Sequence, residues 1–243
     1  MKETREQIIE NLRDDEKYYG EYGQQWLSNS DLKKLIENPK EFRAGVTQTT
    51  PALLQGGYFH TAILEPEKLG NYAVCDVKTR NNREYRELDK PALLTGEVEN
   101  INKMIEVLFD VEELRSLIRD GNVEYEVPNI GEIQGHMFKG KADILNHDRK
   151  LIIDLKTTAD ILKFKRNSYY YSYDSQAYIY EQLFGYDMVF VVIDKTSHQV
   201  GLYDCTSNFY GSGYEKVERA LSVYNKWTAA GFDHRQHFLK GTL

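Results

Sequence analysis

The chain has 243 residues, of which 41% are hydrophobic and 28% charged, a composition that fits one folded α/β domain and excludes a disordered chain. Its net charge of −7 argues against a protein that coats nucleic acid with a basic surface, although an enzyme could still carry local basic residues. There is no apolar run of about 18 residues, no apolar stretch after the charged N-terminus and no paired cysteine motif. We therefore expect a cytoplasmic protein without a membrane span, a signal peptide or a disulfide framework.

The first half of the chain predicts helices. Apolar residues at helical spacing, with prolines or capping residues at the ends, indicate helices over 30–43, 51–67 and 98–118, and a polar, basic loop or marginal helix over 71–90. Ser28 or Ser30 can cap the first helix, and Thr49 or Thr50 can cap the second.

The second half changes to patterns that are typical of strands. Strands are expected over 123–128, 136–145, 151–156, 187–194 and 199–206. A helix over 173–184, with Gly185 as its C-terminal cap, separates the third strand from the fourth, and a last helix is expected from 210 to 230. The order of these elements predicts a mixed α/β domain with a helical N-terminal elaboration.

Two neighbouring strands each carry an aspartate among apolar residues: Asp143 in KADIL and Asp154 in IIDLK, with Lys156 two residues further on. Because residues i and i+2 share a face, Asp154 and Lys156 point one way, while Ile153 and Leu155 point into the core. Two buried carboxylates repel each other unless a cation joins them, and oxygen ligands suit Mg²⁺ or Mn²⁺. Lys156 could then activate a water or stabilise charge on a phosphate. The alternative is a structural ion pair at a strand edge, with Asp143 as a turn residue.

Four further stretches, in order along the chain, complete a resemblance to a known superfamily. They are the opening WLSNSDLKKLIENPKEF, GGYFHTAILEPE with His60, VEYEVP with Glu126 and its rival Glu124, and YDSQAYIYEQLFG with Gln176 and Tyr180. With the two aspartate strands, this set resembles the PD-(D/E)xK nucleases. The match is closest to their RecB-like branch and, within it, to the exonuclease VIII (RecE)-like phage recombination exonucleases. The resemblance covers residues 26–205.

The resemblance implies a restriction-endonuclease-like α/β fold, in which helices flank a central mixed sheet. Residues 1–243 would form a single nuclease domain, with a C-terminal helix and tail over 206–243. His60, Asp143 and Asp154 would bind Mg²⁺ or Mn²⁺ together with the backbone carbonyl of Leu155.

The same resemblance implies roles for the remaining residues. Lys156 would be the catalytic lysine, and Glu126 a supporting acid that binds a second metal or a metal-bound water. Gln176 and Tyr180 would contact DNA or the strand that carries Lys156, whereas simple helix packing is the alternative for both. For His60 the alternative is a histidine with a packing role.

Basic residues cluster at two places that could contact DNA phosphates. Arg80, Arg83 and Arg86 lie in the polar segment, and Lys163, Lys165 and Arg166 precede an aromatic run, SYYYSY, at 168–173. Aromatic side chains can stack on unpaired bases. The alternative is a solvated surface with tyrosines in the core.

The function expected from these observations is a metal-dependent DNA exonuclease that acts on ends of linear double-stranded DNA in phage-type homologous recombination. A homo-oligomer and a single-strand annealing protein are the expected partners. The alternatives are a structure-specific or restriction-type endonuclease on the same fold and a non-catalytic DNA-binding module.

Overall fold

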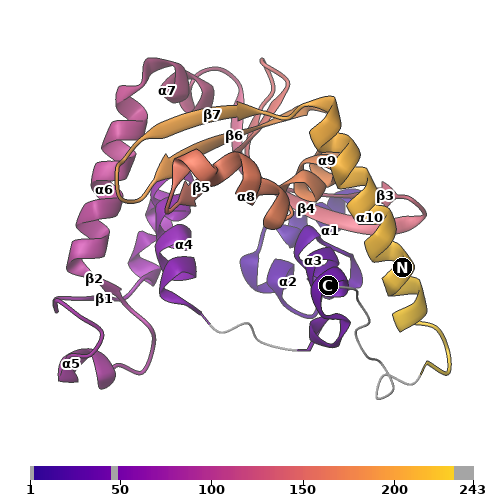
Figure 1. Cartoon of the computed structure of the whole chain (residues 1–243), viewed down its shortest axis with the longest axis horizontal. Coiled ribbons are helices and arrows are strands. Elements are labelled where there is room, and N and C mark those ends of the chain that lie inside the picture. Colours follow the sequence, from indigo (N-terminus) through magenta and orange to yellow (C-terminus); the bar gives the residue numbers. More distant parts are fainter. Residues whose placement is uncertain (1–2, 45–48, 233–243) are drawn as a thin grey trace.

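A five-stranded mixed sheet runs through the centre of the computed structural model, which describes residues 3–44 and 49–232 (Figure 1). In spatial order the strands are β3 (Val123–Ile133), β4 (His136–Asn146), β5 (Leu151–Thr158), β6 (Asp187–Asp194) and β7 (Val200–Asp204). Neighbouring strands are antiparallel except β5 and β6, which are parallel because the chain returns between them through helices. The expected fold class, a mixed sheet flanked by helices, is confirmed.

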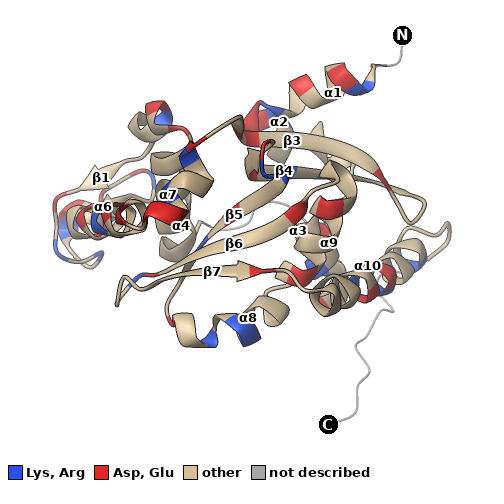
Figure 2. Ribbon diagram, turned by 90° about the horizontal axis from the view of Figure 1, so that it is seen from above, with Lys and Arg blue, Asp and Glu red and all other residues tan. Residues whose placement is uncertain are grey.

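Helices cover both faces of this sheet (Figure 2). One face packs against α3 (Asn29–Glu37), α9 (Tyr173–Phe184) and α10 (Ser207–Trp227), and we call the apolar cluster there the α9 core. The other face packs against α4 (Pro51–Leu64), α6 (Thr95–Asp110) and α7 (Glu112–Arg119), around the α4 core. Along β6, Phe190 faces the α9 core and Val191 the α4 core, so the central strands are buried on both sides.

This double coverage refines the expectation for β5. Ile153 and Leu155 enter the α4 core as predicted. The opposite side of the strand is also covered, and Asp154 is only 1% exposed. The ion pair of Asp154 and Lys156, which was the alternative for these residues, does form, but not at an edge, because β5 is the middle strand of the five. Asp143 lies inside β4 and is not a turn residue.

The N-terminal residues form two helices for which the sequence analysis made no prediction, α1 (Arg5–Leu12) and α2 (Asp15–Tyr19). They pack on β3 and β4 around a small core of Leu12, Tyr18, Trp26 and Ile130. A start signal was present in the sequence, because Thr4 caps α1 and forms a capping box with Gln7.

The helix ends follow their local signals. Ser28 caps α3, Thr50 caps α4, and Gly185 ends α9 in a left-handed conformation, as predicted. The single helix expected over 98–118 is instead two helices, α6 and α7, because the backbone is extended at Val111. This break turns the apolar side chains of both helices into the same α4 core.

β3 is longer than predicted. It continues past 128 to Ile133, because Gln134 and Gly135, both with positive φ, close a tight hairpin to β4. Pro128 is tolerated inside β3 since this strand lies at the edge of the sheet.

The remaining elements are short. The segment 71–90 contains β1 (Val74–Cys75), which pairs with β2 (Leu93–Leu94), and one helical turn, α5 (Arg83–Arg86). α8 (Phe164–Tyr170), also without a prediction, joins β5 to α9. Within the described residues no helix is both long and apolar enough to cross a membrane. The end of the predicted C-terminal tail, 233–243, lies outside the described residues.

Candidate metal centre

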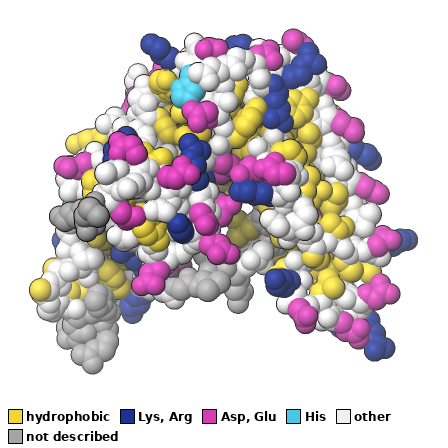
Figure 3. Space-filling view, turned by 180° about the vertical axis from the view of Figure 1, so that it is seen from behind, with side chains coloured by type: hydrophobic (Ala, Val, Ile, Leu, Met, Phe, Trp, Pro, Cys, Tyr) yellow, Lys and Arg dark blue, Asp and Glu magenta, His cyan; other side chains and the backbone are white. Residues whose placement is uncertain are grey.

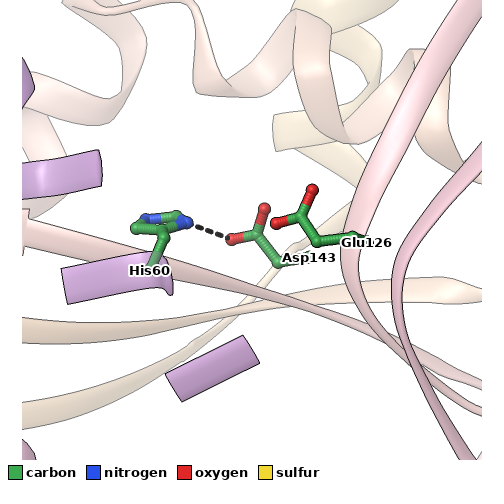
Figure 4. Close-up of side chains that lie close together, drawn as sticks. All are labelled: His60, Glu126 and Asp143. Carbon is green, nitrogen blue, oxygen red and sulfur yellow. Dashed lines mark ion pairs between the residues drawn. The ribbon is translucent and has the colours of Figure 1, made fainter. Parts of the chain in front are cut away.

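Glu126 lies at an irregular point of β3, where the alternation of side chains between the two faces of the sheet is interrupted. Residues i and i+2 of a regular strand share a face, yet Tyr125 packs in the α4 core and Val127 in the α9 core. The backbone of Glu126 has a φ of 50°, a left-handed conformation that costs about 1–3 kcal/mol in a residue other than glycine. The two cores hold the strand in this twist, which brings the carboxylate of Glu126 to Asp143 on β4 (Figure 4).

Asp143 lies at the matching point of β4. Ala142 packs in the α9 core and Ile144 in the α4 core, so this strand also changes faces. The pairing of β3 with β4 skips Glu126 and Asp143, and the pairing of β4 with β5 ends at Ile144. In the gap, Oδ2 of Asp143 accepts a 2.8 Å hydrogen bond from the backbone N–H of Leu155. The separated strands thus make room for a polar site within the sheet.

α4 brings His60 to these two carboxylates. Its neighbours Phe59 and Ile63 are fully buried in the α4 core and fix the helix on the sheet. Nδ1 of His60 lies 3.3 Å from Oδ2 of Asp143, and the ligand atoms of His60, Glu126 and Asp143 all lie within 4.8 Å of one another (Figure 4). Three residues from distant parts of the chain therefore converge on one point.

Asp154 lies beside this group and has two partners of its own. Its Oδ1 accepts a 2.6 Å hydrogen bond from Nε2 of Gln176, and its Oδ2 lies 2.5 Å from Nζ of Lys156. Oδ2 is buried and accepts no hydrogen bond of good geometry from the described residues, so Lys156 acts on it as a charge. The charges of Asp143 and His60 also act on Asp154.

The pKa values of these groups reflect burial and mutual repulsion. Burial, followed by the charge of Asp143, raises the pKa of Glu126 to about 8. Burial also raises the pKa of Asp154 to about 6, although the charge of Lys156 opposes it. Burial alone would lower the pKa of Lys156, but the charges of Asp154 and Asp143 outweigh it and raise that pKa. The site therefore holds more negative charge than its one lysine can balance.

The residues at this site fit a divalent cation. Three carboxylates and one imidazole supply the oxygen and nitrogen ligands that suit Mg²⁺ or Mn²⁺. A cation would relieve the repulsion between the carboxylates, which after burial is a further cause of the raised pKa values of Glu126 and Asp154. Among the described residues, His60, Glu126 and Asp143 are the one group of histidine, cysteine and acidic side chains close enough to share an ion.

Two other predicted site residues lie outside this group. The side chain of Glu124 is 47% exposed, and its carboxylate lies 2.8 Å from Nε2 of His147. The hydroxyl of Tyr180 donates a 2.9 Å hydrogen bond to the carbonyl of Lys141 and accepts one from the N–H of the same residue. Tyr180 thus contacts β4 two residues before Asp143, while Gln176, one turn earlier on α9, donates its hydrogen bond to the carboxylate of Asp154 on β5.

The basic residues of the segment 71–90 are largely engaged. Arg80 forms two hydrogen bonds of 2.7 Å with Glu97, which tie this segment to α6. Arg83 pairs with Glu87, and Arg86 lies on the same helical turn, α5. Figure 1 places α5 at the outer end of the molecule, well away from α8.

The basic residues around α8 are more available. Lys163 pairs with Asp160 at 2.6 Å. The side chains of Lys165 and Arg166 are exposed and have no polar partner in the part of the chain that the structure describes. Figure 2 shows the ribbon of α8 coloured blue by basic residues, whereas on the face in Figure 3 acidic and basic side chains are interspersed.

Two side chains close to the site, Tyr173 and Lys141, had no individual role predicted from the sequence. Nζ of Lys156 lies 4.7 Å from the ring centroid of Tyr173, and only the aromatic run indicated this residue. Lys141 is 4% exposed at its side chain, two residues before Asp143, and pairs with Asp15 at 2.6 Å. No signal in the sequence could have linked Asp15 to β4.

Comparisons with known proteins concern the fold of the whole domain. A family model described as a PDDEXK-like domain of unknown function (DUF3799) matches residues 28–233. A crystal structure from Eubacterium rectale, of a protein provisionally named an exonuclease, shares the fold with a TM-score of 0.64 and 18% identity, covering 95% of each chain. A phage-related exonuclease from Haemophilus somnus is 16% identical over 82% of this chain and 93% of its own, but its TM-score of 0.38 supports no conclusion. No curated protein matches the chain.

Proposed function

Because the chain belongs to the PDDEXK-like domain family of unknown function DUF3799, as the motifs predicted, we propose that it is a metal-dependent deoxyribonuclease that acts as an exonuclease. One observation carries this proposal: His60, Glu126 and Asp143 converge at a single point beside the pair of Asp154 and Lys156. A structural ion-pair network would balance its charges, whereas this group retains an excess of carboxylates.

We assign cation binding to His60 and Asp143, which belong to the group that converges, and to Asp154, which lies beside that group, with the backbone carbonyl of Leu155 as a further ligand. A bound Mg²⁺ or Mn²⁺ would supply a more acidic water and would neutralise charge on the scissile phosphate. Glu126 is the supporting acid, because its raised pKa allows it to hold or release a proton near neutral pH.

Lys156 stays protonated between the carboxylates of Asp154 and Asp143, both of which act to raise its pKa. Its ammonium group can orient the attacking water or stabilise charge that develops on the phosphate. Gln176 fixes the orientation of Asp154 through the hydrogen bond to Oδ1. Tyr180 positions β4 and contacts neither the metal ligands nor the reacting atoms.

The proposed substrate is the end of a linear double-stranded DNA, as in phage-type homologous recombination. The choice of exonuclease rests on the ordered motifs of the sequence, and the provisional name of the Eubacterium rectale protein supports it. Lys163, Lys165 and Arg166 are proposed phosphate contacts, and Arg83 and Arg86 a second, more distant set. Arg80 holds its segment in place through Glu97. A homo-oligomer and a single-strand annealing partner belong to the same proposal.

Incubation of linear and closed circular DNA with the protein and Mg²⁺, with an EDTA control, tests this function. We expect linear DNA to be degraded, circular DNA to survive, and EDTA or Asp154→Asn to stop the reaction. Cutting of the circular DNA would favour the endonuclease alternative. No cleavage of either form with Mg²⁺ or Mn²⁺ would refute the enzyme and favour a DNA-binding module.

A further inference from the structure

α8 and the turn that follows it expose an unusual number of aromatic side chains. Tyr170 is 72% exposed, and Tyr169 and Tyr171 are 43% and 45% exposed. The rings of Tyr170 and Tyr171 lie in edge contact, with centroids 5.2 Å apart. Aromatic side chains gathered at one exposed place form a candidate binding surface.

Positive charge surrounds these rings. Lys165 and Arg166, on α8, have exposed side chains without a polar partner among residues 3–44 and 49–232. From α3, Nζ of Lys33 lies 5.5 Å from the ring centroid of Tyr171 and 3.9 Å from the carboxylate of Glu37. Exposed aromatic side chains together with the unpaired cations of Lys165 and Arg166 match the chemistry of nucleic acid, whose bases stack and whose phosphates carry the charge.

The aromatic surface is held firmly. Ser172, between α8 and α9, has a φ of 62°, and its carbonyl accepts a 3.1 Å hydrogen bond from Asn29 of α3. The ammonium of Lys216, on α10, binds the carbonyl of Tyr169 and lies 2.7 Å from the fully buried Asp174. These contacts fix the backbone that presents the tyrosines, so little entropy is lost when a ligand binds.

A chain of ring contacts joins this surface to the proposed catalytic centre. The ring centroids of Tyr171 and Tyr173 are 5.9 Å apart, and Nζ of Lys156 lies 4.7 Å from the centroid of Tyr173. A strand that leaves Lys156 along α8 would therefore pass Tyr173 first, then Tyr171, then Tyr170.

We propose that Tyr170 and Tyr171, with Lys33, Lys165 and Arg166, form a binding track for unpaired DNA that leads away from the active site. The inference rests on the proposed function and adds to it a preference for single-stranded DNA at this surface. Stacking requires bases with free faces, which the interior of a duplex does not offer, so the track selects the separated strand of a DNA end.

A binding assay without metal and without cleavage tests the track. Fluorescence anisotropy in EDTA would measure affinity for a labelled oligothymidylate and for a blunt hairpin duplex with the same number of nucleotides. We expect Tyr170→Ser with Tyr171→Ser to weaken oligothymidylate binding by roughly 5- to 100-fold per stacked base, and duplex binding much less. Tyr170→Phe with Tyr171→Phe should restore binding, because the rings remain.

One control variant and one variant with altered charge complete the test. Tyr214→Ser removes a tyrosine of α10 that is equally exposed, at 45%, and should leave binding unchanged. Lys165→Gln with Arg166→Gln removes unpartnered surface charges, and should lower the salt slope of oligothymidylate binding by about 1.4, the value for two phosphate contacts.

Wild-type protein that does not bind oligothymidylate, or serine variants that bind it as tightly as wild type, would overturn the track. Equal losses for the two probes would make α8 a duplex contact instead and would also overturn it. The nuclease proposal is judged separately: a protein that binds through the tyrosines but never cuts DNA would refute the enzyme alone, and one that cuts with unchanged binding in the variants would refute the track alone.

Discussion

Asp154 can be ionised in the interior of the sheet because Lys156 and Gln176 interact with its carboxylate in place of water. Nζ of Lys156 and Nε2 of Gln176 each approach a different oxygen of the same carboxylate. The amide completes its hydrogen bond, whereas the ammonium mainly supplies charge. These two neighbours should therefore contribute to activity in different ways.

Lys156→Gln should reduce the rate of DNA cleavage by about 10²- to 10³-fold at saturating Mn²⁺, the usual cost of removing one electrostatic donor from a reaction site. Its affinity for Mn²⁺ should stay the same or increase, since the variant loses a positive charge next to the ligands. Cleavage rates across a Mn²⁺ titration, with calorimetry for affinity, separate the two effects. A variant whose rate recovers at high Mn²⁺ would mean that Lys156 serves the ion rather than the substrate.

Gln176→Leu should lower Mn²⁺ affinity or cleavage by about 10- to 100-fold, as is typical when the partner that orients a metal ligand is lost. The matched control is Gln182→Leu, on the exposed side of the same helix, where the amide contacts only Glu181. Similar activities of the two variants would show that the hydrogen bond to Asp154 is unimportant.

At the scale of elements, α2 covers part of β4 next to the site. Lys139 and Lys141 are both 6% exposed and lie beneath this helix. Lys141 pairs with Asp15, but the ammonium of Lys139 binds only the carbonyl and the ring of Tyr18, and burial lowers its pKa to about 8. The packing of α2 on β4 therefore includes the ion pair of Asp15 and Lys141, in which the ammonium is buried and the carboxylate is partly exposed.

Asp15→Asn should lower the melting temperature at neutral pH by about 2–8 °C. Removing the carboxylate leaves Lys141 buried without its counter-ion, and since half of Asp15 is exposed we take about 1–2 kcal/mol for the loss, at about 2–4 °C per kcal/mol. Burial would raise the pKa of Asp15, but Lys141 and, to a smaller extent, Lys68 outweigh burial and lower that pKa. The stabilisation by this ion pair is thus fully present at pH values above the ordinary pKa of an aspartate, and it disappears as the pH falls through the lowered pKa of Asp15.

Lys141→Met in the Asp15→Asn background should recover much of the lost stability, because the double variant no longer buries the ammonium of Lys141 without its counter-ion. Thermal melts of the two single variants and the double variant measure the coupling. Additive losses would mean that the ion pair does not hold α2 on the sheet.

At the scale of the whole molecule, the excess of carboxylates links stability to pH and metal. Glu126 and Asp154 have pKa values raised to about 8 and about 6, so the folded chain binds more protons than the unfolded chain above their ordinary values near 4. The contribution of these two groups to stability without metal should then fall as the pH rises from about 4.5 to 8. A divalent cation takes the place of the protons and should stabilise the protein most at the upper end of this range.

Melting temperatures of wild type and Glu126→Gln, in EDTA and in Mn²⁺ at pH 5 and pH 8, test this linkage over about the window that the pKa values define. In EDTA the wild type should lose more stability between the two pH values than Glu126→Gln. At pH 8, Mn²⁺ at about 100 times its dissociation constant should add about 2.7 kcal/mol, or about 5–11 °C. Identical pH profiles of the two proteins would show that Glu126 ionises normally and is not part of the site.

Much of the fold follows from local patterns that the sequence displays directly. Ser28 and Thr50 cap α3 and α4 by accepting hydrogen bonds from backbone N–H groups within one turn, so the start of each helix is indicated by residues next to it in the sequence. The strands of the sheet and the two aspartates among apolar residues were also evident, and the ordered motifs led to the family that the comparisons confirm.

Only the tertiary structure decided which carboxylates meet. A regular strand would place Glu124 and Glu126 on one face, and the sequence could not choose between them. Tyr125 and Val127 of β3 pack in cores on opposite faces of the sheet, which twists the backbone at Glu126. The carboxylate of Glu126 therefore lies near Asp143, while Glu124 stays at the surface. His60 reaches the same point because α4 packs across the sheet. Spacing along the chain encodes contacts within an element, but contacts between elements arise from the packing of many side chains at once, which no local pattern contains.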